Sequence, residues 1–221
     1  MATAGRSGDP VLTRRGTLAA LAATTAMPAR SVHASASPRA GTTHGPVVGL
    51  RDGGILSFKG VRYGADTRQT RFQPPRPPAP WTRPVEALDY GAASPQPGGE
   101  PNQSEDCLFL NVWTPGLDAG RRPVMVYVHG GAYSTGSGSS PLTDGSRLAA
   151  RGDVVVVTLN HRLNLFGYAS LARLDPGFAY SGNVGQLDLV LALRWVRYNI
   201  AAFGGDPDRV MVFGQSGGGA K

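Results

Sequence analysis

The sequence predicts an α/β fold built on a mostly parallel central sheet. One long segment with helical spacing precedes the last of several short apolar runs. That last run leads into a glycine-rich turn, which is typical of the connection between a buried strand and the helix that follows it. The runs that suit buried strands lie at residues 108–113, 124–129, 154–160 and 210–213.

The composition indicates a globular protein and argues against nucleic-acid binding. Apolar residues make up 41% of the 221 residues, enough to bury a sizeable core. The formal net charge is +7, but the basic residues are scattered singly and form no basic face with interleaved aromatics. We therefore expect no nucleic-acid partner. No segment reaches the ~18 consecutive apolar residues of a membrane span, so we expect none.

The first 36 residues have the layout of an export signal. Arg14-Arg15 precede a small apolar segment, Leu18–Ala26, and a cleavage site follows at Ala34 or Ala36. The paired arginines suggest the twin-arginine route. An unstructured tail and a start codon assigned too early are the alternatives. We expect residues 1–36 to be the signal and residues 37–221 the domain, exported to the periplasm or outside the cell.

The first elements of the domain are predicted at the edge of the sheet. Alternating residues at 46–50 and 54–61 flank a turn at 51–53, the pattern of an antiparallel hairpin. The proline-rich stretch 73–101 should run extended and irregular. The strand at 124–129 is almost entirely apolar, so we expect it to be buried on both faces.

A βαβ unit is predicted in the second half of the chain. The run 154–160 is strongly β-prone and suits a parallel core strand. A helix is expected from 185 to 203, with its apolar face at positions 190, 193, 196, 200 and 203, and Gly204-Gly205-Asp206-Pro207 as its stop. Strand, helix and strand in this order end at the glycine-rich turn.

Ser216 is the candidate nucleophile. It is the serine of a GxSxG sequence that follows the apolar run 210–213, which we expect to be a buried central strand. Glycines permit a strained strand-to-helix turn that presents one hydroxyl at the top of a sheet. In a chain this rich in Gly and Ser the pattern also arises by chance, so its context decides.

The sequence His129-Gly130-Gly131-Ala132, directly after an apolar strand, predicts an oxyanion loop. Acyl transfer places a negative charge on the carbonyl oxygen, and backbone N–H groups fixed in advance stabilise it. The alternative is an ordinary glycine-rich turn. Because this loop and GxSxG occur in the expected order, each after an apolar strand, the two together favour acyl transfer.

Five motifs occur in order at residues 104–113, 129–132, 160–163, 182–188, and 203–207 running into 213–217. Together they resemble the N-terminal part of type-B carboxylesterases, the carboxylesterase and cholinesterase branch of the α/β-hydrolases. The resemblance covers about residues 45–221 and implies an α/β-hydrolase fold with an antiparallel edge hairpin. It also implies a small-molecule ester substrate and neither a metal nor an organic cofactor.

The same resemblance assigns roles to individual residues. It implies that Ser216 is acylated and that the backbone N–H groups of Gly131, Ala132 and Gly217 form the oxyanion hole. It also implies two structural ion pairs, Arg71 with Glu105 and Arg162 with Asp188, for which solvated surface charge is the alternative.

The chain departs from the family pattern at two positions. Many members carry Glu where this chain has Gln215, which makes recognition of a choline-like cation doubtful. Cys107 is the single cysteine, so it has no disulfide partner within these residues; it is either buried or pairs beyond residue 221.

A serine nucleophile needs a base, and the base needs a third group to hold it. In this fold the chain order is Ser, acid, His, so we expect both partners after residue 221. None of the four histidines is a convincing base: His33 belongs to the signal, His44 precedes the hairpin, His129 is a loop residue and His161 is structural. The chain is therefore expected to be the truncated front part of a longer enzyme, inactive by itself.

Other functions remain open on the sequence alone. A non-catalytic cholinesterase-like binding or adhesion module would keep the fold after losing the nucleophile, and a broken gene would leave a remnant. Among enzymes, a lipase, thioesterase or peptidase shares the serine turn. The sequence does not determine the ester preference or the oligomeric state.

Overall fold

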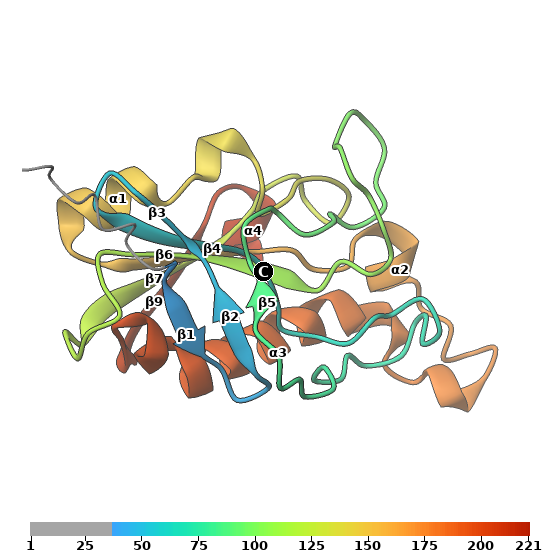
Figure 1. Ribbon diagram of the computed structural model, residues 1–221. Coiled ribbons are helices and arrows are strands. Elements are labelled where there is room, and N and C mark those ends of the chain that lie inside the picture. Colours follow the sequence, from blue (N-terminus) through green and yellow to red (C-terminus); the bar gives the residue numbers. More distant parts are fainter. Residues whose placement is uncertain (1–36) are drawn as a thin grey trace, which may run out of the picture. The chain divides into compact units, whose positions relative to one another are not determined.

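The structure, a computed structural model, describes residues 37–221, so the predicted signal at 1–36 lies outside the described residues. A six-stranded sheet with the order β3-β4-β6-β8-β7-β9 forms its centre, beside a small sheet with the order β1-β2-β5 (Figure 1). The strands are β1 (Arg39–Gly41), β2 (Pro46–Val48), β3 (Leu50–Asp52), β4 (Ile55–Arg62), β5 (Val85–Glu86), β6 (Phe109–Thr114), β7 (Arg122–Val128), β8 (Val155–Leu159) and β9 (Gly205–Gly214).

The helices of this part of the chain lie between and after the later strands. One of them, α3, is long, and it runs along one face of the sheet (Figure 1). The α-helices are α1 (Ser146–Gly152), α2 (Asn164–Tyr168), α3 (Val184–Asn199) and α4 (Gly217–Ala220). Short 3-10 helices are η1 (Pro141–Thr143), η2 (Pro176–Phe178), η3 (Ser181–Asn183) and η4 (Ile200–Phe203).

The central sheet is mixed. Strand β7 pairs in parallel with β8 on one side and with β9 on the other. The pairs β3–β4, β4–β6 and β6–β8 are antiparallel. Because β7 lies between β8 and β9, the predicted βαβ connection through α3 passes over one strand. The carboxyl ends of the three parallel strands therefore lie at the same edge of the sheet.

The edge hairpin is present, but its first arm differs from the prediction. Strand β3 pairs with β4 across Gly53 and Gly54, whose φ angles are 52° and 86°. Residues 46–48, predicted in that arm, instead form β2 in the small sheet. The chain passes from one sheet to the other at Gly49, where a Cβ would lie 2.3 Å from the carbonyl oxygen of Ser57.

Strand β8 is buried on both faces, as predicted for a core strand. Val155 and Val157 pack with α3 in the main core, whereas Val156 packs on the opposite face with a residue of α1. For strand β7 the prediction of burial on both faces is wrong, because Met125 and Tyr127 are only half-buried. The reason is that α1 packs against β4, β6 and β8 and leaves this face of β7 open.

Helix α3 forms where it was predicted and is followed by η4 and by Gly204, whose φ is 77°. Its predicted face is partly wrong: Val190 is 43% exposed, while Leu189 and Ala192 are buried. Residues 187–193 are apolar almost all round the helix, so spacing alone could not identify the buried side.

The run 210–213 forms part of β9, but β9 is not the buried central strand that was expected. Met211 and Val212 are each 50% exposed. Within residues 37–221 the strand pairs only with β7 and forms the edge of the sheet. An apolar run indicates burial, but it does not reveal which element covers it.

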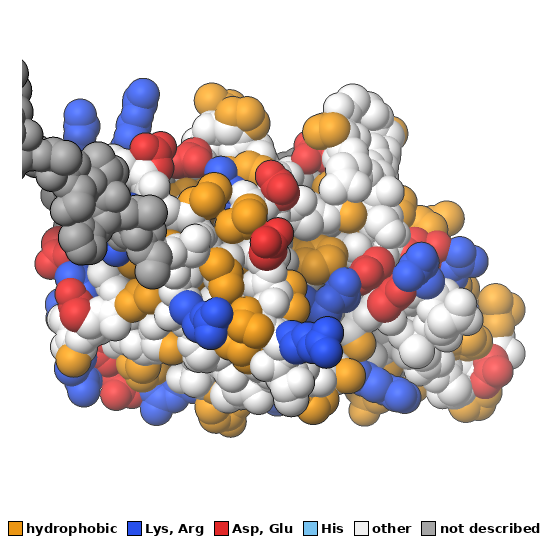
Figure 2. Space-filling model, viewed as in Figure 1, with side chains coloured by type: hydrophobic (Ala, Val, Ile, Leu, Met, Phe, Trp, Pro, Cys, Tyr) orange, Lys and Arg blue, Asp and Glu red, His pale blue; other side chains and the backbone are white. Residues whose placement is uncertain are grey.

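The surface carries charges of both signs. On the face shown in Figure 2, Lys and Arg side chains are intermixed with Asp and Glu. Among residues 37–221, no helix combines the length and apolar character needed to cross a membrane. Cys107 is fully buried, and burial raises the pKa of its thiol.

Both predicted ion pairs are in contact, in very different surroundings. Arg162 donates from Nε and Nη2 to the carboxylate of Asp188 at 2.9 and 2.7 Å, and the two side chains are 2% and 0% exposed. The backbone N–H of Arg162 donates to the same carboxylate at 2.9 Å. Arg71 and Glu105 lie 2.5 Å apart, but the Arg71 side chain is 55% exposed.

We predict that the two pairs differ in their effect on stability. Asp188→Ala leaves the buried Arg162 without its partner and should lower the free energy of unfolding by about 3–5 kcal/mol. Arg71→Ala removes a solvent-screened contact and should cost less than about 1 kcal/mol. Urea unfolding of both variants and the parent measures the difference, and equal losses would contradict the prediction.

Candidate active site

A sharp turn between β9 and α4 holds Ser216. Its backbone has φ 52° and ψ −124°, a strained conformation for a residue with a side chain. The turn packs tightly, since a Cβ on Gly218 would lie 2.1 Å from the carbonyl oxygen of Val128. A Cβ on Gly214 would lie 2.4 Å from the carbonyl carbon of Gly218. Ser216 itself is exposed, so the turn presents its hydroxyl to solvent.

The predicted oxyanion loop leaves β7 beside this turn. Val128 at the end of β7 pairs with Gly214 at the end of β9, so both strands end at the same level. Gly131 and Ala132 have φ angles of 91° and 51°. A Cβ on Gly217 would lie 2.4 Å from the Cα of Ala132. The two segments therefore touch backbone to backbone.

The backbone N–H groups of Gly131, Ala132 and Gly217 lie on these two touching segments. Among the described residues, none of these three N–H groups donates to a protein acceptor. The neighbouring N–H groups of Ser134 and Thr135, in contrast, both donate to the carbonyl oxygen of Gly131. Unpaired donors beside an exposed serine hydroxyl are what a developing oxyanion requires.

His129 and His161 stack on each other, with ring centroids 4.8 Å apart and planes 3° from parallel. The Nδ1 of His129 lies 2.8 Å from the carbonyl oxygen of Gly130, and that of His161 lies 3.0 Å from that of Arg162. A carbonyl only accepts, so each Nδ1 carries a proton, and the lowered pKa of each ring keeps it neutral at pH 7. Burial lowers the pKa of His129 to about 4 and holds the pKa of His161 well below its ordinary value.

The described residues do not supply a general base for Ser216. No hydrogen bond within residues 37–221 reaches its hydroxyl, and the two stacked imidazoles are occupied with backbone carbonyls. His44 lies beside Trp81, with ring centroids 6.4 Å apart. Within residues 37–221 the structure thus brings together the candidate nucleophile Ser216 and the N–H groups, but no acid or base.

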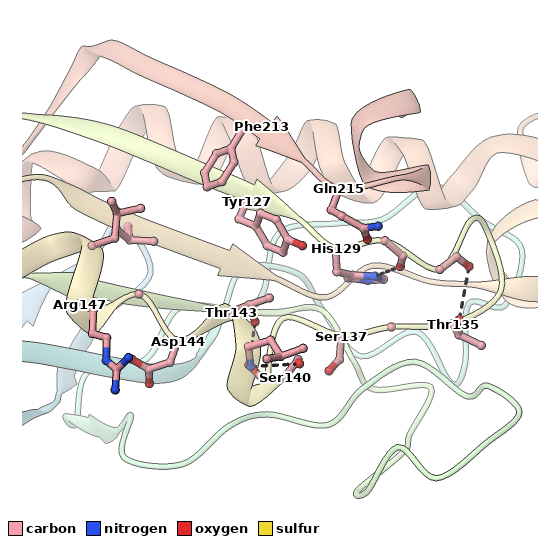
Figure 3. A pocket seen from close by; sticks show the side chains of 17 residues that line it. Tyr127, His129, Thr135, Ser137, Ser140, Thr143, Asp144, Arg147, Phe213 and Gln215 are labelled. Atoms are coloured by element: carbon pink, nitrogen blue, oxygen red, sulfur yellow. Dashed lines mark hydrogen bonds between the residues drawn. The ribbon is translucent and has the colours of Figure 1, made fainter. Parts of the chain in front are cut away.

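A pocket of about 680 Å³ opens beside the turn, on the α1 side of the sheet (Figure 3). Gly130, Gly131 and Gln215 line it where it meets the site, but Ser216 does not. In Figure 3 the side chains of the sheet face those of the η1–α1 segment across the pocket. The labelled residues on the sheet side include Tyr127, Phe213 and Gln215. Those on the η1–α1 side include Ser140, Thr143, Asp144 and Arg147.

Two contacts of the oxyanion loop were missed by sequence reasoning. Asn164, at the start of α2, hydrogen bonds to the loop at Tyr133 and Ser134. Lys221 donates from Nζ to the carbonyl oxygen of Ala132 at 2.5 Å, and burial lowers its pKa to about 8. The one available signal was Asn164 itself, because Asn tolerates the left-handed backbone that such a contact needs.

A mixed sheet whose parallel strand ends carry a strained serine turn and a glycine loop defines the class of α/β-hydrolases. The solved structure of a carboxylesterase from Geobacillus stearothermophilus matches this arrangement with a TM-score of 0.79 at 46% sequence identity. That match covers 81% of this chain and 38% of the other. The fold predicted from the sequence is therefore confirmed.

The carboxylesterase family profile matches residues 30–221, and the chain belongs to the carboxylesterase family. It is 48% identical over 187 residues to para-nitrobenzyl esterase of Bacillus subtilis, covering 80% of this chain and 38% of that protein. It is 42% identical over 193 residues to phenmedipham hydrolase of Pseudarthrobacter oxydans, covering 82% and 38%. It is 38% identical over 232 residues to neuroligin-2 of Mus musculus, covering 82% and 27%. The chain thus spans less than half the length of these relatives.

The strained backbone at Ser216 leads to a stability prediction. Ser216→Ala keeps the Cβ and its strain, whereas Ser216→Gly removes both. Glycine adopts a positive φ without steric cost, so the Gly variant should be more stable than the Ala variant by about 1 kcal/mol. Thermal unfolding of the two proteins tests this, and an Ala variant as stable as the Gly variant would show that the turn is relaxed.

The stacked histidines lead to a pH prediction. The pKa of His129 falls from 6.5 to about 4 on burial, so the unfolded chain binds the proton more tightly. Stability should be complete above pH 6.5 and decline as the pH falls towards 4, by about 3 kcal/mol for this residue. His161 acts in the same direction. Between pH 7 and pH 4.5, the free energy of unfolding in urea should fall less in His129→Asn than in the parent. An equal fall in the two proteins would contradict the prediction.

Proposed function

We propose that the chain carries the nucleophile and oxyanion half of a serine carboxylesterase. The observation that supports this best is the strained, exposed Ser216 next to the free N–H groups of Gly131, Ala132 and Gly217. The names of the relatives, a para-nitrobenzyl esterase and a phenmedipham hydrolase, support small-molecule esters as substrates.

The proposed reaction has two steps. The hydroxyl oxygen of Ser216 attacks the ester carbonyl carbon, and its proton passes to a general base. The negative charge that forms on the carbonyl oxygen is stabilised by the three N–H groups, and the tetrahedral intermediate collapses as the alcohol leaves with the proton. Water, activated by the same base, then attacks the acyl-enzyme and releases the acid and the free serine.

We also propose that the acid and the histidine of the triad lie in polypeptide beyond residue 221. The chain covers 38% of para-nitrobenzyl esterase, and residues 37–221 contain no base in contact with Ser216. The half-open face of β7 and the exposed edge of β9 suit further elements of the sheet. The 221-residue piece should accordingly be inactive on p-nitrophenyl acetate and poorly soluble.

A second candidate function is a non-catalytic binding module. Similarity to neuroligin-2 favours it, but Ser216 and its strained turn favour catalysis, because a binding surface does not need a strained serine.

We also propose that the protein is exported. Arg14-Arg15, the apolar segment 18–26 and the small residues at 34–36 support this proposal.

The test is covalent labelling by a fluorophosphonate. The protein should be produced from its gene with any coding sequence that continues past codon 221. We expect one label on Ser216, no label on Ser216→Ala, and normal labelling of the control Ser170→Ala, which changes an exposed serine away from the turn. A folded, full-length protein that takes no label at Ser216 would favour the binding module.

A further inference from the structure

The oxyanion loop packs on its neighbours at two points: Ala132 lies against Gly217, and the ring of Tyr133 packs edge-on against Tyr168 with ring centroids 4.7 Å apart. Residues 131–134 are all exposed. Hydrogen bonds to its carbonyl groups hold this exposed backbone as well. The carbonyl oxygen of Gly131 is bonded within the loop, by the N–H groups of Ser134 and Thr135. The other three are bonded from outside the loop: that of Ala132 by Nζ of Lys221, and those of Tyr133 and Ser134 both by Asn164.

Asn164 uses both its backbone and its side chain for this contact. Its backbone N–H donates to the carbonyl oxygen of Tyr133 at 2.8 Å. Its Nδ2 donates to Ser134 O at 2.9 Å and to Pro95 O at 3.1 Å. An amide nitrogen carries two hydrogens, so both side-chain bonds form at once. The residue thus joins the loop to the extended segment at Pro95.

Asn164 is itself held by buried structure. Its φ is 53°, a left-handed backbone that Asn tolerates better than most side chains. The residue before it, Leu163, is fully buried, and its N–H donates to the hydroxyl of Ser94 at 3.0 Å. Arg162, one residue earlier, is fixed by the buried pair with Asp188. The contact therefore connects an exposed loop to the rigid interior.

We propose that Asn164 is a positioning residue for the reaction. It sets the oxyanion loop so that the N–H groups of Gly131 and Ala132 point to the oxyanion, and it does not touch the substrate. This inference rests on the proposed esterase function. A loop held less firmly stabilises the transition state less, while ground-state binding of the ester changes little.

Asn164→Gly is the decisive variant. Glycine accepts the positive φ and keeps the backbone N–H, so the protein should fold and lose only the two amide bonds. In the protein produced with any coding sequence that continues past codon 221, we expect kcat for p-nitrophenyl acetate to fall about 10-fold with KM changed less than about 2-fold. Asn164→Asp, which places an oxygen against two carbonyl oxygens, should lose at least as much. Amide hydrogen exchange at Ser134 and Thr135, whose N–H groups are bonded within the loop, should become faster in both.

Asn102→Gly is the matched control. Asn102 also has a positive φ, 52°, and is exposed, and none of the described side-chain hydrogen bonds involves its amide. This variant should keep the parent kcat. If the parent takes a fluorophosphonate label and Asn164→Gly keeps its kcat and its exchange rates, the positioning role is wrong while the esterase proposal stands. A parent that takes no label overturns the esterase proposal and this role with it.

Discussion

The close approach of two backbones at the ends of β7 and β9 is the constraint on which the site depends. Gly217 lies against Ala132, and Gly218 lies against the carbonyl oxygens of Val128 and His129, at distances where no Cβ fits. Parallel pairing of β7 with β9 brings the two segments to one edge of the sheet. Without this contact, the serine hydroxyl and the loop N–H groups would not face the same space.

Interior interactions hold the strand ends that make this contact possible. The buried pair of Arg162 and Asp188 fixes the chain after β8 to α3. The stacked imidazoles of His129 and His161 join the ends of β7 and β8 and remain neutral because both are buried. The exposed Ser216 hydroxyl and the loop N–H groups thus rest on a rigid base, and the strain at Ser216 is sustained by the packing around it.

Local chemistry explains how much the sequence could predict. Glycines around Ser216 let backbones approach where no Cβ fits, and Gly131 after His129 has a positive φ, so the sequence could point to the turn and the loop. Burial depends on what covers a strand, so the exposure of Met211 was not predictable from an apolar run. The bond from the Asn164 amide to Ser134 joins residues 30 apart in sequence; an Asn indicates a possible left-handed backbone, but it does not identify so distant a partner.

The position of one oxygen tests the account most directly. A crystal structure of the full-length protein phosphonylated at Ser216 should place the phosphoryl oxygen about 2.7–3.1 Å from the backbone nitrogens of Gly131, Ala132 and Gly217. A phosphoryl oxygen that points to solvent, with those nitrogens bonded elsewhere, would contradict the account.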